Sequence, residues 1–512
     1  MIAKDFHRIG FSEPEISGSS LGREGLILAG MALLLGCAVP MLLLSGLPNP
    51  QYDWSALVAV AVTFYSAVRL ALYSGRGEQR LLKLTFWVFV YVFMGLTPLL
   101  QIAARTFPYA IFYFRPQTLT AELIVALGLF SYEMGYARAF RSDGSLVRKF
   151  GAALSGYQVS QQRLLLLTGV ALVLSVALVM LNGGIAAVLE PREQMVADLH
   201  ESVGGEGMAK LEVIRNLMQV SPVVSAFIWW SWIVKRRRQG ILIGPKIYLV
   251  FIVVLCIATL TCNPFNGSRY LFASFAVSAL MVTIRDKRWF SPTAVLVLVA
   301  SLMWLYPAVG SLREADQGSM LPDLGVSAVD EQLTNGYDFD GFRSIIDGVS
   351  YVEHDGLAWG RQLLGTMTFW VPREYWDNKP RATGEIVSIN VGYLFTNISS
   401  PLWEEAYVDW GMAGVIVMFF LYGRGSAILD DWHQERSEDV NFGGVLVTFL
   451  AGYQFYTLRG SLWAAVAYLI PIVVLSVVVC KREGWFKVAD ETRIDQTLSN
   501  FTIRHQTVVY PR

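Results

Sequence analysis

The sequence predicts an all-α polytopic membrane protein, with about twelve transmembrane helices and one large loop that bears short helices. Of the 512 residues, 54% are hydrophobic and only 16% are charged, and the mean hydropathy is +0.45. A soluble protein carries about 25% charged residues. Apolar runs close to the ~20 residues that cross a bilayer recur along the chain, and a long polar interval separates the last three of them from the rest.

The apolar runs define the organisation of the chain. We expect spans at residues 26–47, 54–74, 84–103, 119–139, 164–183, 216–234, 246–262, 270–284, 292–309, 406–423, 443–458 and 462–480. These give a polar tail (1–25), nine spans (26–309) with a smaller polar segment at 184–215, the large loop (310–402), three further spans (403–480) and a second tail (481–512). The first tail does not form a cleavable signal, so the first span is expected to act as its own insertion signal.

Positive charge alternates along the connecting loops. The basic loops contain Arg76, Arg80 and Lys83; Arg141, Arg148, Lys149 and Arg163; Lys235, Arg236, Arg237 and Arg238; Arg285, Lys287 and Arg288; and Lys481 with Arg482. With twelve spans, all of these loops fall on the same side. The positive-inside rule therefore predicts that both termini are cytoplasmic and that the segments at 184–215 and 310–402 face outward.

Composition also excludes several classes of protein. Lys+Arg and Asp+Glu both number 41, so the overall charge indicates no nucleic-acid partner. The four cysteines lie in apolar runs, which argues against a disulfide framework, and no metal-ligand spacing is present. Asp338 and Asp340 have a spacing that can hold a divalent cation, but Asp340 is more simply a helix N-cap. We expect no metal and no cofactor.

The smaller outward segment contains an amphipathic pattern. Pro191 suits the first turn of a helix, and Met195, Val196, Leu199 and Val203 would share one face. This pattern predicts a helix on the outer membrane surface or, equally, a helix that caps the bundle.

Outward-facing cations are the exceptions to the charge rule. They include Arg105, Arg115, Arg269, Arg313, Arg361, Arg373, Lys379, Arg381 and Arg459. Arg269 and Arg459 lie in tight turns between spans, where they have little freedom. Because a guanidinium presents a fork of donors that suits phosphate oxygens, a group of them at the outer rim could hold a diphosphate. Alternatively, each cation extends to lipid headgroups or pairs with a carboxylate.

Carboxylates and a histidine lie near the same predicted surface. Glu404 and Glu405 lie at the outer end of the tenth span, with Asp409 about one turn deeper, and each is a candidate general base or simply a carboxylate favoured at a helix N-terminus. His354 is the histidine of the large loop and could also act as a base. Glu122 and Glu133, in the fourth span, are further candidates.

Several short motifs occur in a fixed order. They are Gly267-Ser-Arg269, Phe339-Asp-Gly-Phe342, Gly360-Arg-Gln-Leu-Leu364, Phe369-Trp-Val-Pro-Arg-Glu-Tyr-Trp-Asp-Asn-Lys-Pro380, Glu405-Ala-Tyr-Val-Asp-Trp-Gly-Met-Ala-Gly414 and Leu458-Arg-Gly460. In order, spacing and sidedness, roughly residues 250–470 resemble the O-antigen polymerases, also called oligosaccharide repeat-unit polymerases. The first spans resemble that family only in hydropathy.

The resemblance implies a metal-independent, inverting glycosyltransferase of the membrane C-type class. Such an enzyme joins undecaprenyl-diphosphate-linked repeat units of O-antigen or a related polysaccharide at the periplasmic face of the bacterial inner membrane. Its partners would be the lipid-linked glycan donor and acceptor, the bilayer and a chain-length regulator protein. Outward arginines would hold the leaving diphosphate, and a carboxylate or histidine would deprotonate the acceptor.

The resemblance also suggests roles for individual residues. Cationic positions of the family pattern match Arg269, Arg373, Lys379 and Arg459, with Arg313, Arg361 and Arg381 as further diphosphate-binding candidates. Glu405 and Asp409 lie in the segment that begins Glu-Ala-Tyr, and Glu405 ranks ahead of Glu404 and His354 as the base. Trp370, Trp376 and Trp403 could stack on sugars, and Tyr393 and Tyr407 are further platforms. An interfacial aromatic belt is an equal explanation for Trp403 and Tyr407.

Two rival functions remain open. An O-antigen ligase, which transfers finished glycan to lipid A core, would share the topology and differ in product. A transporter or flippase of lipid-linked sugars would be expected to show inverted repeats and charges at mid-membrane depth. This chain shows no repeat, and most of its unusual charges lie at the predicted outer rim.

Overall fold

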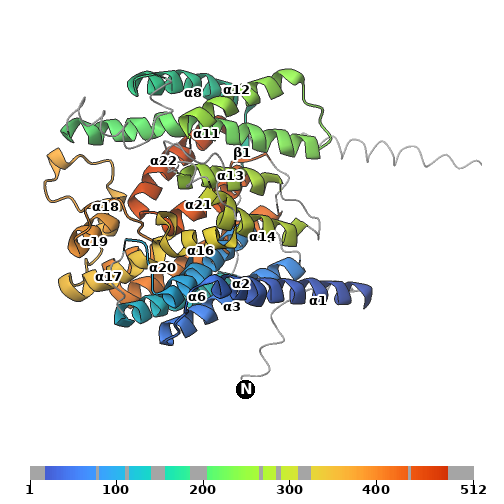
Figure 1. The fold of residues 1–512 in the computed structure, drawn as a ribbon. Helices are drawn as coiled ribbons and strands as arrows, with labels where there is room; N and C mark the ends of the chain where they lie inside the picture. The colour runs from blue at the N-terminus through green and yellow to red at the C-terminus, as the bar shows by residue number, and fades with distance from the viewer. Residues whose placement is uncertain are drawn as a thin grey trace, which may run out of the picture.

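The computed structural model describes residues 18–76, 80–109, 115–139, 156–184, 205–263, 269–283, 290–308, 325–435 and 440–482. Within these ranges the chain is almost entirely helical (Figure 1). The predicted surface helix at residues 190–203 and Arg313 lie outside them. Two three-residue strands, β1 (Tyr157–Val159) and β2 (Cys480–Arg482), pair antiparallel and join the start of one span to the end of another. The sequence analysis did not predict this pair.

Each of the twelve predicted apolar segments coincides with a helix. They are α1 (Gly18–Leu33) continued by η2 (Leu34–Ala38) and α2 (Val39–Gly46); α3 (Trp54–Arg76); α4 (Leu81–Phe89) continued by η3 (Val90–Leu96) and α5 (Thr97–Ala104); α6 (Arg115–Ala139); α8 (Gln161–Leu181); α11 (Gly205–Arg238); α12 (Pro245–Thr261); α13 (Arg269–Thr283); α14 (Phe290–Ala300) continued by η4 (Ser301–Leu305); α20 (Leu402–Glu435); α21 (Phe442–Arg459); and α22 (Leu462–Val479). The segments η2, η3 and η4 are π-helical turns within longer helices.

Eight helices in the described ranges are long and apolar enough to cross a membrane, which makes this an all-α multi-pass membrane protein. The other four, α6, α12, α13 and α21, fall short of that standard in length or hydropathy, and the count of twelve crossings therefore stays a prediction. The helix from Leu81 to Ala104 contains an 18-residue stretch in which every residue is buried within the bundle. A helix that is apolar all round suits such a central position.

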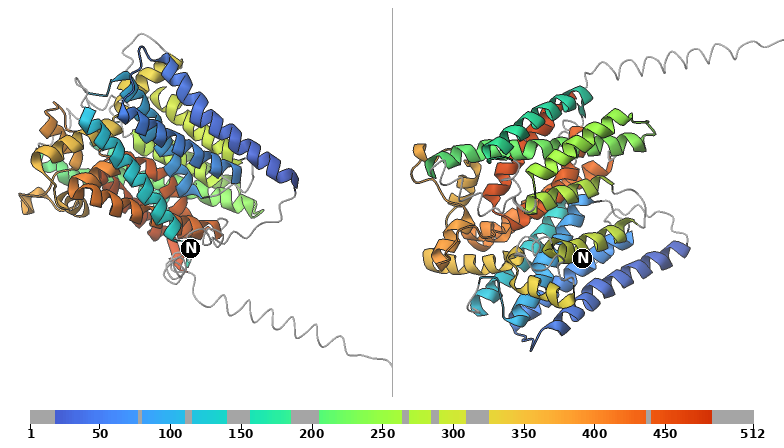
Figure 2. Two further views of the ribbon diagram at one scale, coloured as in Figure 1. Left: turned by 90° about the horizontal axis from the view of Figure 1, so that it is seen from below. Right: turned by 45° about the horizontal axis from the view of Figure 1, so that its top comes forward.

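The polar interval carries the short helices that the sequence predicts. Within 325–401 they are α16 (Val326–Asn335), η5 (Tyr337–Phe339), α17 (Gly341–Asp355), α18 (Arg361–Met367), η6 (Arg373–Tyr375) and α19 (Thr383–Val391). Figures 1 and 2 show α17, α18 and α19 together at one end of the bundle. On which side of a membrane this end lies remains a prediction.

Helix ends that the charge rule assigns to the same side meet in the structure. At the end away from the loop, Arg69 pairs with Glu133 at 2.5 Å, and the Asp430 carboxylate accepts the amide hydrogens of Leu82 and Lys83. These residues come from α3, α6, α20 and α4. The predicted topology also places these helix ends on one side, and that topology stays a prediction.

The helix α20 is broken just after its start. Trp410 has φ −140° and ψ 17°, which is not helical, and Gly411 has φ +61°, a value that favours glycine. Residues 402–409 therefore form a separate leg that packs against α17, α18 and α19, and the span proper follows the break. This leg carries the three carboxylates that the sequence predicts at the outer rim.

Candidate functional site

Residues 337–340, which we call the DxD turn, form a junction between the loop and the bundle. Gln101 Nε2 donates hydrogen bonds to the carbonyl oxygens of Leu333 and Phe339, at 3.0 and 2.9 Å. The Tyr270 hydroxyl donates to the carbonyl of Asp338. Groups from α5 and α13 therefore fix a turn that is distant from both in sequence.

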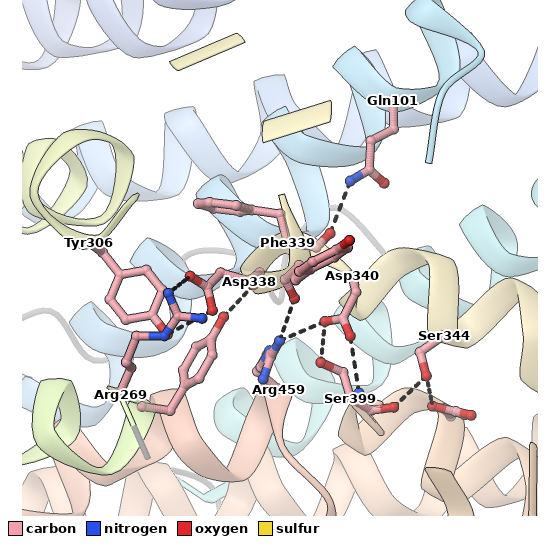
Figure 3. Close-up of polar contacts among 12 residues, drawn as sticks. Gln101, Arg269, Tyr306, Asp338, Phe339, Asp340, Ser344, Ser399 and Arg459 are labelled. Carbon is pink, nitrogen blue, oxygen red and sulfur yellow. Dashed lines mark hydrogen bonds and ion pairs between the residues drawn. The ribbon is translucent and has the colours of Figure 1, made fainter. Parts of the chain in front are cut away.

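Two arginines from separate inter-span turns converge on the DxD turn (Figure 3). Arg269, at the start of α13, pairs with Asp338 at 2.9 Å, and Tyr306 donates to the same carboxylate at 3.4 Å. Arg459, at the end of α21, pairs with Asp340 at 2.7 Å. The two arginine side chains are 14% and 16% exposed, so both lie near the surface without being free to rotate.

Arg459 makes the larger number of contacts. Its Nη2 also donates to the carbonyl of Tyr337 at 3.0 Å, and its guanidinium lies over the Tyr270 ring at 4.0 Å from the ring centroid. Its buried Nε has no hydrogen-bond partner in the described part of the chain. The cation is thus held in place, and its Nε remains as an unused donor.

The role predicted for Asp340 is corrected in part. Asp340 does occupy the N-cap position of α17, but its side chain makes no capping hydrogen bond. Its carboxylate instead binds Arg459 and accepts from the hydroxyl and amide groups of Ser399. Among the described residues, His, Cys, Asp and Glu side chains form no group of three that could hold a metal ion.

Glu405, ranked first as the base, links the starts of two helices. One carboxylate oxygen accepts the Leu462 amide at 2.9 Å, at the start of α22, and the other accepts the Thr383 hydroxyl at the start of α19. Asp409 behaves in the same way, since its two oxygens accept the amides of Gln362 and Leu363 at 3.1 and 2.9 Å. A carboxylate bound by the first amides of a helix is stabilised in its charged form by those donors. Both residues are therefore positioned for structural roles.

Glu404 differs from these two carboxylates. It is fully buried, and one oxygen accepts the Ser344 hydroxyl at 2.8 Å. The other oxygen has no partner within the described ranges. Glu404 packs against Gly348, where an added Cβ would lie 2.8 Å from the Glu404 Cγ. Glycine is thus needed for the glutamate to approach α17 so closely.

A buried ion pair on α17 was missed by the sequence analysis. Arg343 binds Asp347 through Nη2 at 2.8 Å and Nε at 3.2 Å, and the two side chains are 5% and 3% exposed. The Tyr393 hydroxyl donates to the same carboxylate at 2.8 Å. Burial raises the pKa of Asp347 to about 6, although Arg343 opposes that rise. The i,i+4 spacing of Arg343 and Asp347 is a signal that could have revealed the pair.

The remaining predicted cations do not join this group. Arg373 donates to the carbonyls of Lys379 and Pro380 at 2.7 and 3.4 Å, within its own segment. Lys379 is buried, donates to two carbonyls of the same segment and lies over the Trp463 ring. Burial, with Arg373 nearby, lowers the pKa of Lys379. Lys379 thus supports the segment from inside and is not a surface donor.

Three further predicted residues are exposed. Arg381 pairs with Glu385 one helical turn away at 3.1 Å, an ordinary surface pair. Arg361 is exposed at the start of α18. His354 is exposed near the end of α17, where its Nδ1 lies 2.7 Å from the carbonyl oxygen of Ser350.

The three tryptophans have different environments. Trp370 is exposed, and Trp376 is half-buried. Trp403 is fully buried: its ring stacks with Phe89 and lies tilted against Phe419, and its Nε1 donates to the carbonyl of Val125 at 3.3 Å. Trp403 is therefore a core residue and offers no face to a sugar. Gly128 provides the space for its ring.

Comparison with known proteins gives no match: no family model, no curated protein and no solved structure matches this chain.

Proposed function

We propose that this protein is a glycosyltransferase that joins glycan units carried on a polyprenyl diphosphate, as an O-antigen-type polymerase. The support comes from three features: the multi-pass helical bundle, the folded polar loop at one end of it, and the cationic junction between them. The observation that carries the proposal is the convergence of Arg269 and Arg459 on the DxD turn. Two cations from tight inter-span turns form one site at the bundle end, where a membrane-anchored diphosphate would present its phosphates.

The ion pairs with Asp338 and Asp340 leave donors for a substrate. A guanidinium has five N–H donors, and a carboxylate engages only some of them. The unpartnered Nε of Arg459 is one donor that remains. Because the aspartates already fix the side chains, binding a diphosphate would require little reorganisation, which is the condition for strong electrostatic catalysis.

The transfer step follows from these groups. The bond between the anomeric carbon and the diphosphate oxygen breaks, and the leaving oxygen takes the electron pair under the influence of the two guanidinium groups. The acceptor hydroxyl attacks the same carbon and loses its proton to a carboxylate. We take Glu404 as the first candidate for that carboxylate because one of its oxygens has no partner within the described ranges, whereas both oxygens of Glu405 are bound. Since Glu404 is fully buried against Gly348, the acceptor hydroxyl must displace the contact with α17 to reach it.

Arginine-to-lysine substitutions test the cationic site. Arg269→Lys and Arg459→Lys keep the charge and lose the fork, so each should lower polymer formation by about 10² to 10³. Lys246→Ala, an exposed cation at the start of α12, is the matched control and should retain activity. Polysaccharide length on gels, with protein level measured in parallel, gives the readout. Normal polymer from both lysine variants would contradict the proposal.

Substitution of the adjacent glutamates tests the base. Glu404→Gln should abolish transfer at unchanged protein level, because an amide cannot take the proton. Glu405→Gln should lower the thermal midpoint and retain transfer, since its role is to anchor α19 and α22. Equal activities for the two variants would rule out Glu404 as the base.

Analysis of the lipid-linked intermediates separates polymerase from ligase. Cells of the source organism that lack the protein should accumulate a single repeat unit if it is a polymerase. Accumulation of full-length polymer on the lipid carrier would identify a ligase and refute polymerisation.

A further inference from the structure

Four aromatic side chains form a cluster beside the DxD turn. Tyr109 and Tyr337 stack with ring centroids 4.8 Å apart, and Tyr393 and Phe395 stack at 5.5 Å. Tyr109 joins the two pairs, because its ring centroid is 5.9 Å from that of Tyr393 and 4.8 Å from that of Phe395. We call Tyr109, Tyr337, Tyr393 and Phe395 the aromatic cluster.

The aromatic cluster contains a strained backbone conformation and is partly exposed to solvent. Tyr109 has φ +62°, a left-handed conformation that L side chains rarely adopt. Such strain is retained where the surrounding structure enforces it, frequently at functional sites. Tyr337 is 57% exposed and Phe395 is 40% exposed. Aromatic rings that serve only to fill a core would be covered.

A buried polar group adjoins the aromatic cluster through Tyr393. The ring of Tyr393 stacks in the cluster, while its hydroxyl donates to Asp347 and accepts from Arg343 Nε at 3.3 Å. Arg343 Nη1 is buried and has no partner in the described ranges. An unpaired guanidinium nitrogen in a site only 5% exposed is costly unless a ligand completes it.

The aromatic cluster also borders the cationic site. The main-chain carbonyl of Tyr337 accepts a hydrogen bond from Arg459. Burial raises the pKa of Tyr109, and the neighbouring Asp340 carboxylate raises it further, which places this hydroxyl within electrostatic reach of the DxD turn. A ligand on the aromatic rings would thus lie next to Arg459.

We propose that the aromatic cluster and the Arg343–Asp347 pair form a subsite for a sugar ring of the glycan. A pyranose presents a C–H face that packs on aromatic rings and a rim of hydroxyl groups that donate to carboxylates and accept from guanidinium nitrogens. Exposed rings beside a buried, incompletely paired ionic group match both features. The inference rests on the proposed function for the identity of the ligand as a glycan.

Direct binding of a soluble glycan tests the subsite apart from catalysis. The probe is the oligosaccharide released by mild acid from the surface polysaccharide of the source cells, with neither diphosphate nor lipid. Its dissociation constant is measured by calorimetry against the full chain in lipid nanodiscs. Tyr337→Leu removes one stacking face, and Tyr393→Phe removes one hydroxyl without disturbing the stack.

The expected results differ by position. Each variant should bind the probe about tenfold more weakly than the wild type. The matched control Tyr375→Leu, which changes an 81% exposed tyrosine outside the cluster, should bind within about twofold of the wild type. Thermal midpoints check that the variants are folded.

The outcomes separate this inference from the proposed function. Equal affinities for Tyr337→Leu, Tyr393→Phe and Tyr375→Leu, or no binding by the wild type, would overturn the subsite. The variants could instead lose binding as predicted while deletion of the protein leaves the cellular polysaccharide unchanged. That result would refute polymerisation and support the subsite.

Discussion

At the scale of single residues, five buried polar side chains of the candidate site fall into two kinds. In Glu405 and Asp409 both carboxylate oxygens accept hydrogen bonds from groups at helix starts. In Glu404, Arg343 and Arg459 one buried polar atom has no partner within the described ranges. Leaving a buried polar atom unpaired costs about 1–3 kcal/mol. A substrate that forms a hydrogen bond with one of these three unpaired atoms would therefore gain the most binding free energy.

The Asp347 carboxylate should make stability depend on pH. Its pKa in the folded protein is about 6, raised from 3.8 by burial, so the folded state binds this proton more tightly than the unfolded state does. Protonation of Asp347 therefore stabilises the folded state fully below about pH 4. This stabilisation, about 3 kcal/mol, is lost as the pH rises through 6. The thermal midpoint of the wild type should fall over this window relative to that of Asp347→Asn, and parallel curves would contradict the assignment.

The sequence could not distinguish these two kinds of residue. Glu404 and Glu405 are adjacent and look equivalent, yet their partners come from residues 344, 383 and 462, which only the tertiary fold brings together. Arg269 and Arg459 were identifiable because an arginine in a tight inter-span turn is unusual in itself. Tyr109 carried no such signal, since its role depends on a left-handed backbone conformation.

At the scale of elements, α17 and the 402–409 leg of α20 are held together by a close contact. The contact depends on Gly348, which lies directly against Glu404. The Ser344 hydroxyl, one turn earlier, lies within hydrogen-bond distance of both the same glutamate and the carbonyl of Ser399. Hydropathy predicted α20 as a span, but it could not predict the break at Trp410 and Gly411 that turns the leg toward the loop.

Substitution of Gly348 should separate these two elements. In Gly348→Ala the added methyl group would lie 2.8 Å from Glu404 Cγ, so the variant should lose about 1–3 kcal/mol of stability and most of its transfer activity. Gly169→Ala, in α8 with no atom within 4 Å of the new Cβ, is the matched control and should be neutral. Thermal midpoints and polymer yield provide the measurement. Equal behaviour of the two variants would show that the α17–α20 contact is not tight.

At the scale of the whole molecule, hydropathy predicted the positions of the helices, whereas the sidedness inferred from charge stays a prediction. All twelve apolar segments are helical, because apolar length and backbone hydrogen bonding leave a spanning segment little alternative. The environment of each side chain was harder to predict. Trp403 looked interfacial because it stands at the loop boundary, but Gly128 of α6 admits its ring into the core.

The sidedness of the bundle can be measured with single cysteines. Tyr375 and Lys246 are exposed and lie on opposite sides in the predicted topology. In a background without the exposed Cys37 and Cys256, a membrane-impermeant thiol reagent should label Tyr375→Cys in intact cells. It should label Lys246→Cys only after permeabilisation. The reverse labelling pattern would show the opposite membrane orientation, with the DxD turn on the cytoplasmic side.

The central claim is that one chain elongates a lipid-linked glycan at the DxD turn. The most direct test reconstitutes the purified protein in liposomes with the diphosphate-linked repeat unit of the source cells, in the presence of a chelator. For the wild type we predict a ladder of lipid-linked products that grows by one repeat at a time. The double variant Arg269→Lys/Arg459→Lys should give no ladder, although its thermal midpoint equals that of the wild type. A single unextended species with the folded wild type, or an undiminished ladder from the double variant, would contradict the account.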